Sequence, residues 1–153
     1  RHSFPTRRSS DLVPSAFLLN SINTLFQISI TNGWPVLTKI FPELEGKIGG
    51  CGIRVPVPDG SLTDITFNVK RQVSIEEINQ AFKKASETNF KGILDYTEDP
   101  IVSVDIIGNK NSCLFDAQLT SVIDKMVKIV GWYDNEIGYS SRLIDLITFV
   151  SKK

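Results

Sequence analysis

The feature that most constrains the fold is a change in hydrophobic period within one short stretch of the chain. Residues 65–70 alternate Ile, Phe and Val with Thr, Asn and Lys, which is the pattern of a strand with one buried face. Residues 75–85 then place Ile, Ile, Phe and Ala on one helical stripe, and Ser74 with Glu77 has the spacing of a capping box. The sequence therefore predicts a half-buried strand followed at once by an amphipathic helix.

Further short apolar segments follow, separated by turn residues. We expect them to form strands over 92–96, 102–107, 112–117, 119–123 and 128–133. Residues 108–109 are expected to form a turn, and residues 58–60 to close a hairpin within 50–71. The short connections favour antiparallel pairing. The predicted class is α+β, with a mixed, mostly antiparallel sheet and helices packed on one face.

A last helix is predicted over residues 136–150. Its apolar stripe, which we expect to be buried, consists of Tyr139, Leu143, Leu146, Ile147 and Val150. Asp134 or Asn135 is expected to cap this helix, because a short side-chain oxygen can accept from an unpaired N–H, and Glu136 suits the positive end of the helix dipole. An alternative interpretation is that the Asn135 amide also faces a ligand, because an amide can both donate to and accept from a carboxamide.

The composition argues against several classes of partner. The 153 residues are 41% hydrophobic and carry 17 basic and 17 acidic side chains. The chain is therefore long enough for one domain and has no net charge to attract nucleic acid or an anionic membrane. Cys51 and Cys113 lie far apart, with no further Cys or His at metal-ligand spacing. Neither a metal site nor a disulfide is expected, both residues are interpreted as small core residues, and a reducing cytosol fits.

The N-terminal part of the chain is interpreted separately. Residues 1–12 are rich in Arg and Ser, which is typical of a transit peptide. Residues 2–12 nevertheless back-translate to a common sequencing-adapter sequence, so we expect a non-native leader. The apolar part of residues 13–37 contains Asn and Gln and is shorter than the ~20 apolar residues of a membrane span. No transmembrane segment is expected; residues 13–37 stay unassigned, and the domain is expected over 38–153.

Three segments of the chain together resemble a known family. They are "VGWYDNEIGYSSRLIDLI", "PELEGKIGGCGIRVPVPDGSLTDITFNV" and "KGILDYTEDPIVSVDIIGNKNSCLFDA". In order and spacing they resemble the C-terminal catalytic domain of phosphorylating glyceraldehyde-3-phosphate dehydrogenase. The resemblance implies a cytoplasmic glycolytic oxidoreductase that assembles as a homotetramer. It also implies that NAD, or NADP, is reduced while a phosphorylated aldehyde and inorganic phosphate become an acyl phosphate.

The resemblance assigns roles to three residues around the start of the last helix. Asn135 matches the Asn that holds the nicotinamide carboxamide. Tyr133 and Tyr139 match tyrosines near the reacting centre. Core packing is the alternative for both tyrosines, and more so for Tyr139, because it continues the apolar stripe.

Two further residues are implied to bind phosphate. Arg54 matches the Arg that binds substrate or inorganic phosphate, and a guanidinium on a strand would offer phosphate oxygens a rigid fork of donors. Without the resemblance, a surface ion pair is the commoner role for such an Arg. Thr31 matches one position of the family's T-G-A-A-K loop, although Pro35 stands where a Lys is expected. We expect Arg54 and Asn135 to face one pocket.

Two parts of the family's machinery have no counterpart in the sequence. The nucleophile motif S-C-T-T-N-C is absent, and the sole histidine, His2, lies in the suspected leader, so no Cys and His pair is available for nucleophilic catalysis. No G-x-G-x-x-G follows a predicted strand. We therefore expect a truncated catalytic domain that is inactive alone. The alternatives are a fragment of erythrose-4-phosphate dehydrogenase and a non-catalytic oligomerisation or interaction module.

Overall fold

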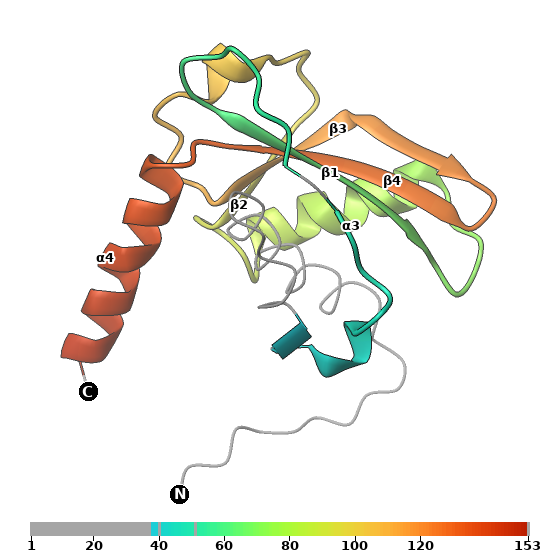
Figure 1. Cartoon of the computed structure of the whole chain (residues 1–153), viewed down its shortest axis with the longest axis horizontal. Helices are drawn as coiled ribbons and strands as arrows, with labels where there is room; N and C mark the ends of the chain where they lie inside the picture. The colour runs from blue at the N-terminus through green and yellow to red at the C-terminus, as the bar shows by residue number, and fades with distance from the viewer. Residues whose placement is uncertain (1–37, 40, 51, 153) are drawn as a thin grey trace, which may run out of the picture.

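The computed structural model describes residues 38–39, 41–50 and 52–152, and Figure 1 shows an open sheet with one long helix behind it and another leaving its end. The elements are η1 (Pro42–Leu44), β1 (Ser61–Asn68), α3 (Ile75–Glu87), β2 (Leu94–Thr97), η2 (Ser103–Ile106), β3 (Cys113–Ile123), β4 (Met126–Tyr133) and α4 (Ile137–Ser151). The predicted α+β class is confirmed.

The four strands form one sheet in the order β1-β4-β3-β2. β4 pairs antiparallel with both β1 and β3, whereas β2 pairs parallel with β3. The sheet is therefore mixed and mostly antiparallel, as predicted, although the antiparallel pairing that short connections favour does not occur between β2 and β3. The connection over 98–112 contains η2 and the turn at Gly108, where φ is +83°, and it returns the chain to the end at which β2 began.

Three of the predicted strands, 102–107, 112–117 and 119–123, are not found as separate strands. Residues 102–107 do not form a strand, because Ser103–Ile106 is the 3-10 helix η2. The Asp105 carboxylate accepts from the Val102 N–H at 2.8 Å, and this local bond opposes the β preference of the neighbouring Val and Ile residues. The segments 112–117 and 119–123 belong to the single strand β3, whose register with β4 shifts between Asp116 and Ser121.

The hairpin predicted within 50–71 is also wrong. Ser61–Asn68 forms β1, but its partner is β4 rather than the preceding residues, and 52–57 contains no strand. The turn itself exists, because Gly60 has φ +83°, a left-handed conformation that glycine adopts without strain. The turn redirects an irregular segment into β1, at the sheet end where β4 finishes.

The core lies between α3 and one face of the sheet. Ser74 caps α3 by accepting from the Glu77 N–H at 3.1 Å, as predicted, while the Glu77 carboxylate pairs with Arg71. The ring of Phe82 stacks on Phe115 of β3 with centroids 4.0 Å apart. The other buried members of the core are Ile78, Ala85, Leu94, Cys113, Ala117, Val127, Ile129 and Tyr133.

Helix α4 does not bury its apolar stripe in the described part of the chain, so that expectation is wrong. Figure 1 shows α4 running away from the end of the sheet. Ile147 is 67% exposed, and Gly138 is the only buried residue among the fifteen of α4. In its second turn, Arg142 contacts the segment that leads into β2, with Nη1 donating to the Gly92 carbonyl at 2.9 Å. The 3.6-residue period predicted the helix, but it could not supply a surface for the helix to pack on.

Candidate functional site

The junction between β4 and α4 is organised by the buried carboxylate of Asp134, which is 1% exposed. Its Oδ1 accepts from the N–H groups of Glu136 and Ile137 at 2.9 and 2.8 Å, and its Oδ2 accepts from the Gly108 N–H at 2.9 Å. Burial alone would raise the pKa of Asp134, but these backbone hydrogen bonds outweigh it and lower the pKa. The side chain thus caps α4, as predicted, and ties the helix to the turn after η2.

Asn135 is held by a hydrogen bond from a residue that lies far away in the sequence. Its Oδ1 accepts from the Ser61 hydroxyl at 3.0 Å. Ser61 opens β1 and lies opposite Tyr133 in the ladder, so the hydrogen-bonded sheet brings it close to Asn135, two residues beyond the end of β4. The side chain of Asn135 is half-buried. With its oxygen occupied by Ser61, the amide keeps its NH₂ group as a donor for a further partner.

The two candidate tyrosines lie in different environments. Tyr133 is 6% exposed and belongs to the core cluster, whereas Tyr139 is 53% exposed in the first turn of α4. Core packing was the alternative interpretation favoured for Tyr139. The structure reverses this, because the ring of Tyr139 is open to solvent while the ring of Tyr133 packs in the core.

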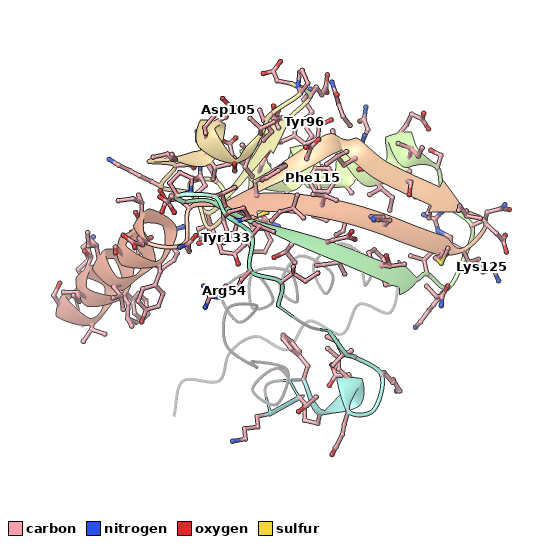
Figure 2. All side chains as sticks on the ribbon, turned by 45° about the horizontal axis from the view of Figure 1, so that its top comes forward. Arg54, Tyr96, Asp105, Phe115, Lys125 and Tyr133 are labelled. Carbon is pink, nitrogen blue, oxygen red and sulfur yellow. The ribbon has the colours of Figure 1, made fainter. Side chains whose placement is uncertain are left out.

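Arg54 lies away from any strand. Figure 2 shows it on the irregular segment that leads into β1, below the sheet in that view, with Tyr133 at the end of β4 above it. The expectation that Arg54 projects from a strand, which would hold it rigidly, is therefore wrong. Its guanidinium is exposed and has no ion pair among the residues that the structure describes. Thr31 and Cys51 lie outside the described residues.

Backbone packing fixes the start of α4. A Cβ atom at Gly138 would lie 3.1 Å from the Asn111 carbonyl oxygen, which is tighter than most side chains tolerate. Gly138 therefore lets the first turn of α4 lie against the start of β3. Sequence reasoning missed this contact and the role of Ser61, since Ser61 and Asn111 are remote in the chain and neither residue type is unusual where it stands.

A cleft of about 680 Å³ lies elsewhere, between the C-terminal half of α3 and the edge strand β2. Tyr96 lines it, with Lys83 Nζ 5.3 Å from the ring centroid. Burial, helped by the Glu98 carboxylate that accepts from its hydroxyl, raises the pKa of Tyr96 to about 12. Neither Asn135 nor Arg54 lines this cleft, so a pocket shared by those two residues stays a prediction.

Three further features remain: the Cys113 thiol, metal binding and membrane-spanning helices. Cys113 is fully buried, as predicted for a core residue, and burial followed by the charge of Asp95 raises the pKa of its thiol. Over residues 38–39, 41–50 and 52–152, no group of three or more His, Cys, Asp or Glu side chains could hold a metal ion. Within the same residues, no helix combines the length and apolar character needed to cross a bilayer.

Comparison with known proteins identifies the domain. The sequence model described as "Glyceraldehyde 3-phosphate dehydrogenase, C-terminal domain" matches residues 28–135, a match that begins upstream of the expected domain start. Glyceraldehyde-3-phosphate dehydrogenase 2 of Streptomyces avermitilis is 54% identical over 115 residues, covering 74% of this chain and 34% of that protein. The enzyme of Mycobacterium avium is 52% identical over 113 residues, covering 74% of this chain and 33% of that protein.

The fold and these matches define the C-terminal domain of an oxidoreductase family. The chain belongs to the glyceraldehyde-3-phosphate dehydrogenase family. It spans about a third of the length of the curated relatives that it matches. The relatives do not favour the alternatives of an erythrose-4-phosphate dehydrogenase or a non-catalytic module.

Proposed function

We propose that this domain takes part in the NAD-dependent oxidation of a phosphorylated aldehyde to an acyl phosphate, with inorganic phosphate as the second substrate. NADP remains an alternative cofactor. The nucleophile, the base and the dinucleotide-binding domain come from sequence outside this chain. The complete enzyme would be a cytoplasmic homotetramer. The observation that carries the proposal is the held amide of Asn135, at the junction of β4 and α4.

Asn135 binds the carboxamide of the nicotinamide ring in this proposal. The Ser61 hydroxyl occupies Oδ1 at 3.0 Å, which leaves Nδ2 to donate to the carboxamide oxygen. Asp134 fixes the backbone on one side by accepting from Glu136 and Ile137. A donor held from both sides pays little conformational entropy on binding, and it favours one orientation of the ring.

Arg54 supplies the phosphate-binding charge in this proposal. Its guanidinium is exposed and has no carboxylate partner among the described residues, so an anion would not have to displace an existing ion pair. Charge-assisted hydrogen bonds from a guanidinium to phosphate are roughly twice as strong as neutral ones. Tyr133 and Tyr139 flank Asn135 along the chain and would contribute near the reacting centre. Thr31 is a further phosphate ligand in this proposal.

A chimera tests the proposal. The segment of this chain that matches Streptomyces avermitilis glyceraldehyde-3-phosphate dehydrogenase 2 replaces its counterpart in that enzyme, and NADH formation is followed with glyceraldehyde 3-phosphate and phosphate. We expect activity, a raised KM for NAD in Asn135→Ala, and a raised KM for phosphate or aldehyde in Arg54→Ala. Asn89→Ala and Arg71→Ala, both at exposed positions of the same residue type, are the matched controls. A folded tetrameric chimera without activity, or one indifferent to Asn135→Ala, would contradict the proposal.

A further inference from the structure

The turn before β1 places a reactive pair of groups in contact. The Gly60 N–H donates to Oδ1 of Asp59, its own neighbour, at 2.6 Å. Among the described residues, this carboxylate oxygen is the acceptor for the Gly60 N–H, and no backbone carbonyl competes for it. Both residues are half-buried rather than enclosed. The amide nitrogen of Gly60 therefore lies against the carboxyl group whose carbon it could attack.

We propose that Asp59 is a site of spontaneous aspartate isomerisation. The Gly60 nitrogen attacks Cγ of the protonated Asp59 carboxyl group, and a new C–N bond closes a five-membered succinimide. The carboxyl OH group leaves with the amide proton as water. Water then adds to one of the two ring carbonyls and opens the ring. Opening on one side restores aspartate, and opening on the other leaves the chain running through the side chain as isoaspartate. The water released by ring closure balances the water that opens the ring, and no oxidant is needed.

The residue that follows Asp59 explains why this position would react. Gly60 has no Cβ to obstruct the attack, and its φ of +83° is a conformation that other residues rarely adopt. Asp95 provides an internal comparison, because its Oδ1 likewise accepts from the next N–H, that of Tyr96, at 2.9 Å. There the following residue is bulky and lies in β2, paired with β3. Asp59 and Asp95 thus make the same contact, and of these two aspartates Asp59 is the one followed by glycine.

Isomerisation would act on the candidate cofactor site. Isoaspartate adds one methylene to the backbone at residue 59, two residues before Ser61, whose hydroxyl donates to Asn135. The turn packs closely against the start of η2, since a Cβ at Gly60 would lie 2.8 Å from the Ser103 carbonyl oxygen, so a longer backbone here would shift its neighbours. We therefore expect Ser61 to move and Asn135 to lose its fixed orientation. This consequence for cofactor binding rests on the proposed function, whereas the isomerisation does not.

Ageing the 153-residue chain tests the inference. The folded chain is incubated in neutral buffer, digested and mapped by mass spectrometry, with isoaspartate counted by enzymatic methylation. We expect isoaspartate to accumulate at position 59 and not at 95, and to be lost at 59 in Asp59→Glu, whose longer side chain cannot form the same ring. A urea-unfolded sample measures the intrinsic rate. Isoaspartate at 59 only in the unfolded sample, or equally at 95, would overturn the proposal.

A second measurement tests the consequence. The side-chain amide resonances of Asn135 are compared between fresh and aged chain by NMR. We expect the aged fraction to show shifted Asn135 signals, and we expect the same of Ser61→Ala. Unchanged Asn135 signals in a sample that contains isoaspartate would overturn the link between the turn and the site. Failure of the proposed function is a separate result, seen as an inactive chimera.

Discussion

Removal of the Asp134 carboxylate should destabilise the domain more than any other single change at the β4–α4 junction. Three N–H groups, of Gly108, Glu136 and Ile137, donate to it. A buried donor left without a partner costs about 1–3 kcal/mol. Because Gly108, Glu136 and Ile137 are exposed residues, water can reach part of the freed backbone. For Asp134→Ala we expect a loss of about 3–4 kcal/mol of unfolding free energy, against about 5–15 kcal/mol for a whole domain.

Asp134→Asn removes the negative charge but keeps the size and shape of the side chain, so it separates the two contributions to stability. The Asn carbonyl oxygen can still accept from the helix N–H groups, but its NH₂ group would face the Gly108 N–H, donor against donor. We expect a smaller loss, about 1–2 kcal/mol. Urea unfolding followed by tryptophan fluorescence measures both variants from the midpoint and the m-value. Asp64→Asn is the control, because Asp64 forms an exposed pair with Lys128 at 2.6 Å, worth about 0–1 kcal/mol.

The pH dependence gives an independent check. The pKa of Asp134 is lower in the folded domain than its usual value, because backbone hydrogen bonds outweigh burial. The carboxylate therefore stabilises the fold fully above the unfolded-state pKa of about 3.9, and this contribution is lost as pH falls through the lower folded value. The difference in stability between wild type and Asp134→Asn should narrow in acid. A loss below about 1 kcal/mol for Asp134→Ala at neutral pH, or a difference that widens in acid, would refute the reasoning.

Four further outcomes are expected. Phe82→Ala removes a ring that stacks on Phe115 at 4.0 Å and should cost about 3–5 kcal/mol in urea unfolding, with Lys84→Ala on the exposed face of α3 as control. Ser61→Ala should cost about 1 kcal/mol and broaden the Asn135 amide signals, whereas Ser61→Thr should restore them. The 153-residue chain should not reduce NAD with glyceraldehyde 3-phosphate, since it contains no S-C-T-T-N-C motif, and measurable turnover that depends on Asn135 would contradict this. Because α4 exposes Ile144, Ile147 and Phe149, the chain should self-associate with rising concentration in size-exclusion chromatography. Ile147→Lys should reduce that association, and a monomer at every concentration would count against it.

Local signals in the sequence determined the elements whose stability is local. Ser74 and the apolar stripe of α3 predicted that helix and its start, because capping and amphipathicity act within a few residues. The alternation over 65–70 predicted the buried face of β1. The family could also be read from sequence, because its motifs preserve order and spacing. The identity of Asp134 or Asn135 as the capping residue was left open, and the three backbone donors around Asp134 decide it.

Pairing and burial were decided only by the tertiary structure. Nothing in β2 itself shows that it runs parallel to β3, because strand direction depends on how the intervening chain returns. The apolar stripe of α4 predicted burial but not a partner surface, and in the described residues the helix stays exposed. The site follows the same rule. Asn135 could be singled out from sequence, but its hydrogen bond from Ser61 exists because the ladder between β1 and β4 joins residues that are remote in the chain.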